Sequence, residues 1–485
     1  MTARRPPIAW IAGGAAVPLL FAIGLIAGAQ PRFGIAAALV LVYAVLVFTN
    51  LSAALTVLII IVFAESTPLA GPALSATKIA GMLLVLGWIA RVATEPETRR
   101  SVLFAAHPAL SYLLVSFVAW VLLSTTWARD GALAFDAAVV FLLVAILYLI
   151  VFTAIRDRRQ AIWVIGALVL GTAFTAAYGL VLRPDPNTQT SERLASTIND
   201  PNFLAAILVV GLVLGAAAFF AARGHRLLQF GALIAVGLSF VAFLLTGSRG
   251  GIVGLGVALI AGIALGGRWR LRIALGAALA TVLLVGYYTM FAPPLLKQRI
   301  VAATAGEVSR ADTRSTIWTV AWRMAEDHPV TGVGIGNFEA RSVEYILQPG
   351  TTYRTDRVID NPGVAHNSYL GPFAEIGIIG VIMLLGIIVL SLACTVQAYR
   401  RFERNRDGPM EVLTRGLLIA LIGILTSAFF ISAESNKVIW LMMAMGPALL
   451  AVAESAPPAR HPVRRGPAYG TAPRSAAVRP LARPS

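Results

Sequence analysis

The 485-residue sequence is poor in charged residues and has a single cysteine, Cys394. Charged residues make up 13% of the chain and hydrophobic residues 58%. Soluble enzymes and disordered chains are excluded, because neither class tolerates such a composition. One cysteine also excludes an internal disulfide and a CxxC metal or redox site. The mean hydropathy of +0.80 instead predicts an all-α membrane protein with many spans.

The chain is strongly basic, with 39 Lys and Arg residues against 23 Asp and Glu residues and a net charge of +16. In a soluble protein this excess would suggest a nucleic-acid partner. In a membrane protein it is expected first from the positive-inside rule, which keeps Lys and Arg in cytoplasmic loops. We therefore expect the lipid bilayer, and no nucleic acid, as the partner of these charges.

Runs of about 20 mostly apolar residues, the length that crosses a bilayer, predict about 12 to 14 transmembrane helices. The first run resembles a signal peptide, but it is longer than usual, which favours its retention as a span. The second and third runs are split only at Thr49 and Asn50. The predicted spans lie near residues 8–29, 34–48, 51–64, 77–93, 108–124, 135–155, 160–182, 203–222, 227–246, 249–266, 271–290, 366–396, 412–432 and 436–454.

The positions of the arginines predict the orientation of these spans. If the N terminus is inside, most arginines that flank the spans fall on the inner side, as the positive-inside rule requires. Examples are Arg91, Arg156, Arg268 and Arg400. We therefore predict a multi-pass protein of the inner, or plasma, membrane with both termini in the cytoplasm.

Two segments fall outside the predicted spans. Residues 291–365 face outward in this topology and contain eight basic and eight acidic residues, which predicts a small extracytoplasmic helical subdomain. Residues 455–485 are rich in Pro, Ala and Arg and predict a disordered, basic cytoplasmic tail. The first eleven spans then occupy residues 1–290, and the last three occupy residues 366–454.

Within the outer subdomain, residues 312–326 predict a helix that Asp312 can cap. On this helix Arg314, Trp318 and Trp322 recur at intervals of four residues, so they lie along one stripe. The stripe has two interpretations. It can anchor the helix at the membrane interface, or Arg314 can bind a phosphate, because its planar guanidinium donates two hydrogen bonds to one anion.

Glycines at positions 332, 334 and 336 form a GxGxG pattern directly after this helix. A dinucleotide-binding fingerprint has a different spacing and follows a strand. The pattern therefore predicts a turn at which the backbone approaches another element or a ligand closely.

The chain is predicted to re-enter the membrane at residues 365–370, where His366 lies at the outer mouth of a span. The positive end of a helix favours a neutral imidazole, which can accept a proton. A lone histidine at a membrane surface is, however, more often structural than catalytic. Glu375 follows at about 180° around an ideal helix, so it should not orient His366 unless the helix is broken.

Arg249 lies in the motif TGSRGG, a predicted outward turn between two apolar spans. An unpaired cation at the lipid boundary is costly. Its presence indicates either a side chain that snorkels to the interface or a functional anion site.

A further predicted outer loop, residues 193–203, contains Arg193 and Asn202. Asp200 is suited to cap the span that follows. A helix cap and a turn are favoured for this loop over contact with a substrate.

Together these motifs resemble the bacterial O-antigen ligase and O-antigen polymerase superfamily. The resemblance is specific from about residue 190 to residue 400 and is topological elsewhere. It is carried by Ser-Arg-Gly around Arg249, Arg314 with Trp318, the segment 328–338, His-Asn-Ser-Tyr-Leu from His366, Glu375 with Gly377, and the segment 199–202.

The resemblance implies a GT-C-like membrane glycosyltransferase that uses no nucleotide sugar and no cofactor. Such an enzyme would move a glycan from undecaprenyl diphosphate to an acceptor hydroxyl on the outer face of the inner membrane, in an inverting, metal-independent reaction. Arg249 and Arg314 would bind the diphosphate, and His366 would assist the acceptor hydroxyl. Further substrate contacts would come from Arg193, Asn202, Trp318, Asn367, Tyr369 and Glu375.

The residue types agree with these roles. A diphosphate leaving group needs charge stabilisation from a divalent cation or from Arg and Lys side chains. The predicted outer segments offer arginines, whereas paired carboxylates and His or Cys residues at metal-ligand spacing are scarce there.

Other functions stay open at this point, the weakest of them a purely structural scaffold. A transporter or flippase of a lipid-linked glycan or another anion would also have many spans and buried arginines, although transporters tend to show repeated halves and helices interrupted near the midplane. Among transferases the acceptor decides the activity. A lipid A core makes a ligase, which is slightly favoured; a second repeat unit makes a polymerase, and a protein makes an oligosaccharyltransferase.

Overall fold

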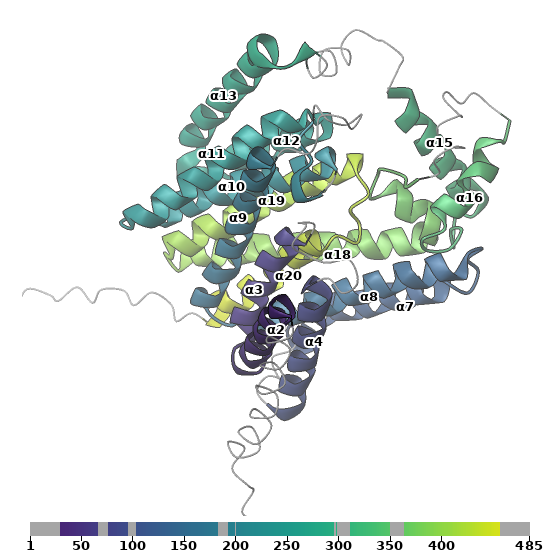
Figure 1. Cartoon of the computed structure of the whole chain (residues 1–485), viewed down its shortest axis with the longest axis horizontal. Coiled ribbons are helices and arrows are strands. Elements are labelled where there is room, and N and C mark those ends of the chain that lie inside the picture. The colour runs from purple at the N-terminus through teal and green to yellow at the C-terminus, as the bar shows by residue number, and fades with distance from the viewer. Residues whose placement is uncertain are drawn as a thin grey trace, which may run out of the picture.

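The computed structural model describes residues 30–65, 76–95, 103–182, 193–198, 200–294, 297, 311–349 and 363–455. This part of the chain is helical and contains no strand (Figure 1), so the predicted all-α class is confirmed. The predicted first span and residues 456–485 lie outside it. The helices are α2 (Pro31–Thr49), α3 (Leu51–Ala64), α4 (Ala76–Thr94), α6 (Leu103–Ala106), α7 (Pro108–Ser124), α8 (Gly131–Ala154), α9 (Arg158–Val181), η1 (Ser196–Ile198), α10 (Pro201–Ala221), α11 (Arg226–Thr246), α12 (Arg249–Leu265), η2 (Gly267–Trp269), α13 (Arg270–Gly286), η3 (Tyr287–Phe291), α15 (Ala311–Asp327), α16 (Phe338–Ile346), α18 (Leu370–Arg404), α19 (Gly408–Ser427), η4 (Ala428–Phe430) and α20 (Lys437–Ser455).

Nine helices of the described part are long and apolar enough to cross a membrane. Four shorter apolar helices, α2, α3, α7 and α12, accompany them. These helices coincide with every predicted span except the first, which confirms a polytopic membrane protein. The span predicted from residue 366 begins later, as α18, at Leu370.

The apolar stretch of residues 33–64 forms two helices. The α2 helix ends at Thr49, and Asn50 caps α3 because its side-chain oxygen accepts a hydrogen bond from the Ala53 N–H at 3.1 Å. An Asn side chain competes for such backbone groups and so favours a helix start over a helix interior. The predicted split at Thr49 and Asn50 is therefore confirmed.

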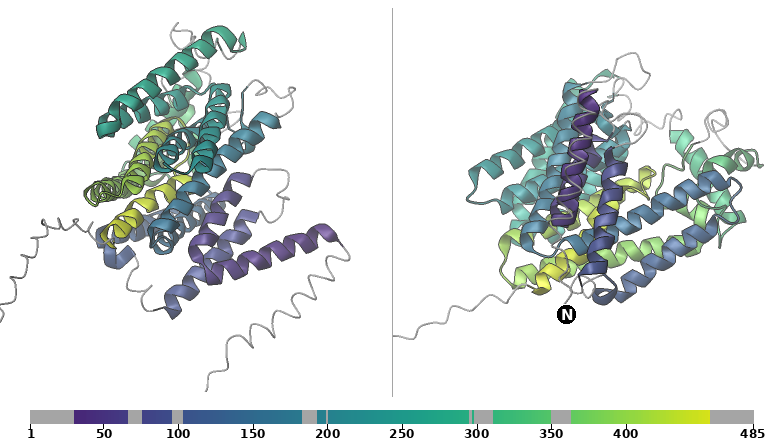
Figure 2. Two further views of the ribbon diagram at one scale, coloured as in Figure 1. Left: turned by 90° about the vertical axis from the view of Figure 1, so that its left-hand side faces the viewer. Right: turned by 60° about the horizontal axis from the view of Figure 1, so that its bottom comes forward.

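The C-terminal helix α20 lies at the centre of the bundle, between α18 and α8. Its Trp440 is fully buried, and its ring lies 6.0 to 6.5 Å from the rings of Phe117, Phe141 and Tyr148. By contrast, α13 lies at the edge of the bundle (Figure 1) and buries none of its residues. In the left view of Figure 2 the purple N-terminal helices lie on the opposite side from α13.

The two ends of the bundle differ in their polar residues. One end carries α15 and α16, which lie next to the start of α18 at the right of Figure 1. The other end carries ion pairs between helix termini, such as Arg158 with Asp407 at 3.4 Å and Arg268 with Glu411 at 3.6 Å. The end with α15 and α16 is the α15 end, and the end with the ion pairs is the arginine end.

Candidate functional site

Four polar side chains from separate segments gather at the α15 end, where Arg314 interacts electrostatically with the other three. Asp200 caps α10, Arg249 is the first residue of α12, Arg314 lies in the first turn of α15, and His366 precedes α18. Four segments spread between residues 200 and 366 of the chain therefore supply one charged cluster. The cluster unites the three principal predicted residues and adds Asp200, which sequence reasoning had treated only as a helix cap.

Electrostatic coupling links the members of this cluster. Burial lowers the pKa of His366 below its ordinary value, and the Arg314 cation lowers that pKa further, while Asp200 opposes both effects. Burial also lowers the pKa of Arg314. The Arg249 cation lowers this pKa further, whereas the Asp200 carboxylate raises it. Two cations that disfavour each other, with one nearby carboxylate, form a site that gains stability when an anion binds.

The turn before Arg249 fixes this residue at a helix N terminus. Gly247, with φ +54°, ends α11, and the Ser248 hydroxyl accepts a hydrogen bond from the Gly251 N–H at 3.2 Å. A side chain at Gly250 would overlap Phe430. The helix start is therefore packed too closely for larger residues on that side, and the half-buried Arg249 lies where the helix exposes its unpaired N–H groups.

Arg193 and Asn202 brace this turn. Arg193 donates one hydrogen bond to the Thr246 carbonyl at 2.7 Å and another to the Asn202 side-chain oxygen at 2.8 Å. The Ser248 hydroxyl donates to the same Asn202 oxygen at 3.1 Å. The predicted helix cap is confirmed, since Asp200 accepts hydrogen bonds from the first N–H groups of α10.

The two tryptophans of the predicted stripe on α15 lie in different surroundings. The Trp318 ring lies 5.5 Å from the Phe429 ring, and its indole N–H is buried with no hydrogen-bond partner in the described residues. Trp322 is 52% exposed, with its ring 6.0 Å from that of Phe373. Trp318 thus joins α15 to the turn after α19, while Trp322 keeps the exposure expected of an interfacial anchor.

His366 is held in an unusual backbone conformation, with φ +50°. This left-handed region is unfavourable for a residue with a side chain. Ser368 fixes the segment, because its N–H donates to the Ala428 carbonyl at 3.0 Å and its hydroxyl donates to the Ile431 carbonyl at 2.7 Å. The segment before α18 is therefore tied to the connection between α19 and α20. His366 lies ahead of the helix and not in its first turn, so burial and Arg314, rather than the helix end, lower the pKa of its imidazole.

Asn367 and Tyr369, two predicted substrate contacts, have partners within the protein. The buried Asn367 side chain accepts hydrogen bonds from the N–H groups of Tyr369 and Leu370, at 2.9 and 3.0 Å. The Tyr369 hydroxyl donates to the Leu425 carbonyl at 2.7 Å. Both residues position the His366 segment.

The glycine-rich turn packs into a break in α18. Gly377 has φ +64° and ψ −172°, a conformation that interrupts the helix. The Ile378 N–H donates to the Pro329 carbonyl at 2.9 Å, and the Gly334 N–H donates to the Glu375 carbonyl at 2.8 Å. A Cβ at Gly332 would overlap the backbone of Glu375. The prediction that these glycines permit close backbone approach is confirmed.

The Glu375 side chain adds a further hydrogen bond between α18 and the segment that follows the glycine-rich turn. Its Oε1 accepts a hydrogen bond from the Phe338 N–H, at 3.0 Å, in the first turn of α16. The helix is broken next to it, as required for a role near His366, but its observed partner belongs to α16.

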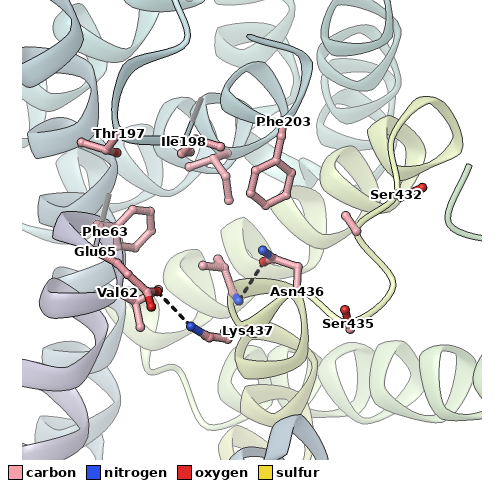
Figure 3. A pocket seen from close by; sticks show the side chains of 13 residues that line it. Val62, Phe63, Glu65, Thr197, Ile198, Phe203, Ser432, Ser435, Asn436 and Lys437 are labelled. Carbon is pink, nitrogen blue, oxygen red and sulfur yellow. Dashed lines mark hydrogen bonds and ion pairs between the residues drawn. The ribbon is translucent and has the colours of Figure 1, made fainter. Parts of the chain in front are cut away.

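Figure 3 shows a cavity of about 330 Å³. It lies beside the His366 segment, because the N–H of its lining residue Ala433 donates a hydrogen bond to the Ser368 hydroxyl at 2.8 Å. Phe203, three residues after Asp200, points into it from α10. An ion pair of 2.9 Å between Lys437 and Glu65 closes one side. The remaining walls come from the end of α3, from η1 and from the connection before α20, with the residues Val62, Phe63, Thr197, Ile198, Ile207, Ser432, Ala433, Ser435, Asn436 and Val438.

Sequence reasoning missed this cavity. The available signal was a pair of charged residues, Glu65 and Lys437, at the ends of two apolar spans, where charge is costly unless it is paired. Within the described residues, no three His, Cys, Asp or Glu side chains are grouped so that they could hold a metal ion.

Comparisons with known proteins agree with the motifs. Residues 234–385 match the family model described as O-Antigen ligase, and the match includes the segments of Arg249, Arg314 and His366. The teichuronic acid biosynthesis protein TuaE of Bacillus subtilis (strain 168) is 28% identical over 133 residues, which are 27% of this chain and 25% of the relative. The aligned part thus spans only a quarter of that relative's length. The predicted resemblance to the O-antigen ligase superfamily is confirmed.

Among solved structures, the chain is similar to one from a study titled "Structural coordination of polymerization and crosslinking by a peptidoglycan synthase complex". The TM-score is 0.41 at 17% identity, and the match covers 72% of this chain and 98% of that one.

We expect Gly377→Ala to destabilise the protein by about 1–3 kcal/mol, the cost of a backbone conformation that is essentially restricted to glycine. The added Cβ would also overlap the Val330 carbonyl. The measurement is the apparent Tm of the detergent-purified protein. Gly237→Ala is the matched control, because it lies within α11 and its added Cβ meets no atom within 4 Å. Equal Tm values for the two variants would show that the break is not needed for stability.

Proposed function

From the O-antigen ligase match over residues 234–385, we propose that this membrane glycosyltransferase-like protein moves a glycan from undecaprenyl diphosphate to an acceptor hydroxyl, with ligase activity slightly favoured over polymerase activity. The observation that carries the proposal is the cluster of Arg249, Arg314 and His366. It combines two cations suited to a diphosphate with a base that stays neutral.

The arginines bind and stabilise the leaving group. The bond between the first sugar carbon and the diphosphate oxygen breaks with its electron pair on the diphosphate, so negative charge grows there during the reaction. Arg249 and Arg314 come from α12 and α15, and each guanidinium can donate two hydrogen bonds to one phosphate. The N terminus of α12 adds its own partial positive charge. This arrangement supplies the stabilisation that a divalent cation would otherwise provide.

His366 accepts the proton of the acceptor hydroxyl as the hydroxyl oxygen forms the new bond to the sugar carbon. A lowered pKa keeps the imidazole unprotonated at neutral pH, which this role requires. Attack from the face opposite the diphosphate inverts the configuration of that carbon.

The cavity beside the cluster is suited to the acceptor. Its lining combines the ring of Phe203 with hydroxyl and amide side chains such as Ser435 and Asn436. An aromatic face with a few polar groups matches a hydroxylated sugar ring, which is apolar on its faces and polar at its edge. Donor and acceptor would then approach the cluster from different sides.

We further propose that the α15 end faces away from the cytoplasm. The arginine end agrees with the positive-inside rule, since the basic residues between α10 and α11, between α12 and α13, and between α18 and α19 lie there. Lipid-linked glycan and acceptor would meet on the outer face.

The transfer reaction itself tests the assignment of roles. Arg249→Lys or Arg314→Lys keeps the charge but loses the bidentate hydrogen bonding, and should weaken donor use by roughly 1.5–3 kcal/mol, or about ten- to 150-fold. His366→Ala should leave donor binding nearly intact and lower the transfer rate by about two to four decades. Transfer is followed by mass spectrometry of candidate acceptors, with and without chelator, and donor binding is measured separately on solubilised variants.

The matched controls for these variants are Arg129→Lys and His328→Ala, which lie outside the cluster and should behave as wild type. If His366→Ala loses donor binding as severely as Arg249→Ala, the base assignment is wrong. Full transfer by His366→Ala would instead favour a transporter. Loss of transfer in chelator, restored by Mg²⁺, would refute metal independence.

The pH dependence of transfer tests the neutral base. Because only unprotonated His366 accepts a proton, kcat/KM should fall as the pH drops through a pKa below 6.5, the ordinary value. Asp200 raises that pKa, so Asp200→Asn should move the acidic limb to lower pH, while the amide oxygen can still cap α10. Asp130→Asn, at the cap of α8, is the control and should cause no shift. An acidic limb that moves to higher pH in Asp200→Asn would contradict the proposed interaction between Asp200 and His366.

Thiol labelling tests the orientation in a Cys394→Ala background, using right-side-out membrane vesicles. Leu347→Cys, at a position 68% exposed at the α15 end, should react with a membrane-impermeant maleimide directly. Arg404→Cys, at the exposed end of α18, should react only after permeabilisation. The opposite pattern would reverse the proposed topology.

A further inference from the structure

A mostly apolar groove of about 250 Å³ separates α13 from α10, α11, α12 and α19. In Figure 1, α13 stands away from the rest of the bundle, and its described contacts with the spans run mainly to α12. A helix that buries none of its residues leaves room for a ligand between itself and the bundle. Apolar residues that line the groove include Leu212, Phe220, Phe240, Leu255, Ile273 and Ala280.

The groove is polar only at the arginine end. Trp269, Arg272 and Arg415 line it there. The guanidinium carbons of Arg223 and Arg272 lie 4.3 and 4.8 Å from the Trp269 ring centre, and that of Arg268 lies 5.7 Å away. Positive charge therefore gathers around one indole at the mouth of an otherwise apolar space.

Two buried N–H groups at this mouth have no hydrogen-bond acceptor within the described residues: the Trp269 indole and the Nε of Arg415. Arg415 is only 7% exposed, and its other nitrogens are engaged by the Leu265 carbonyl at 2.7 Å and by Glu411 at 2.9 Å. A buried donor without an acceptor is costly. A ligand with acceptor oxygens would satisfy both.

The length of the groove matches one lipid chain. From Gly266 at its polar end to Leu255 near its apolar end, α12 rises about 16 Å at 1.5 Å per residue, roughly half of a bilayer core of about 30 Å. An acyl chain reaching from the headgroup region to the bilayer centre covers the same distance.

We propose that this groove binds one anionic phospholipid. Its acyl chain lies between α13 and the bundle, and its phosphate and ester oxygens accept hydrogen bonds from Arg272, Trp269 and the Nε of Arg415. Basic residues between transmembrane helices are suited to anionic headgroups. The site is at the arginine end, apart from the cluster around His366, and does not depend on glycan transfer.

Native mass spectrometry of the purified full chain tests this site with phosphatidylglycerol and phosphatidylcholine of identical acyl chains. Phosphatidylglycerol should be retained at least fivefold better. Arg272→Gln should abolish most of this preference, and Ala280→Phe, which fills the groove, should reduce retention of both lipids. Inorganic phosphate should not displace phosphatidylglycerol, because it lacks the acyl chain.

Matched controls are Arg226→Gln, an exposed arginine at the same end, and Ala278→Phe, on the exposed face of the same helix. Neither residue lines the groove, so both variants should bind lipid as the wild type does. Equal retention of the two lipids, or equal losses in Arg272→Gln and Arg226→Gln, would overturn the proposal. Displacement by inorganic phosphate alone would show a free-anion site instead.

Discussion

The backbone hydrogen bonds between the glycine-rich turn of residues 329–336 and the start of α18 determine where α15 and α16 lie relative to the bundle. These bonds run between main-chain groups, such as Gly334 to Glu375 and Ile378 to Pro329. Main-chain bonds hold position more tightly than contacts between long side chains, which lose rotamer freedom when they are fixed. Since α15 precedes this turn directly, these bonds also set the position of Arg314 relative to the spans.

A second set of contacts brings the other members of the cluster to the same place. Ser368 ties the His366 segment to the turn after α19, and the close packing of Gly250 against Phe430 ties the start of α12 to that same turn. The short connection between α19 and α20 thus fixes the positions of two helix starts, those of α12 and α18. The Arg249 cation at the start of α12 and the Arg314 cation on α15 would repel each other in isolation, and Asp200 opposes this effect on Arg314.

Much of the fold could be predicted from the sequence, because a span needs only a long apolar run, and even the split at Asn50 follows from one side chain that caps a helix. The cluster was predictable in part: Arg249 and His366 stand out as polar groups at span ends. The roles of Arg193, Asn202 and Glu375 could not be predicted, since their partners, Thr246 and Phe338 among them, lie far along the chain. The cavity beside Phe203 likewise needs four separate segments to exist.

The shortness of α3 bears on the depth at which the neighbouring cavity opens. Its 14 residues rise about 21 Å at 1.5 Å per residue, against a hydrocarbon core of about 30 Å. Either the bilayer thins beside this helix, or Glu65 and the cavity mouth lie below the plane of the surrounding headgroups. In both cases the cavity mouth lies closer to the bilayer centre than the headgroups of an unperturbed membrane do. A membrane-anchored molecule would then need less extension out of the lipid to enter the cavity, and bilayer thickness would become a variable that controls access.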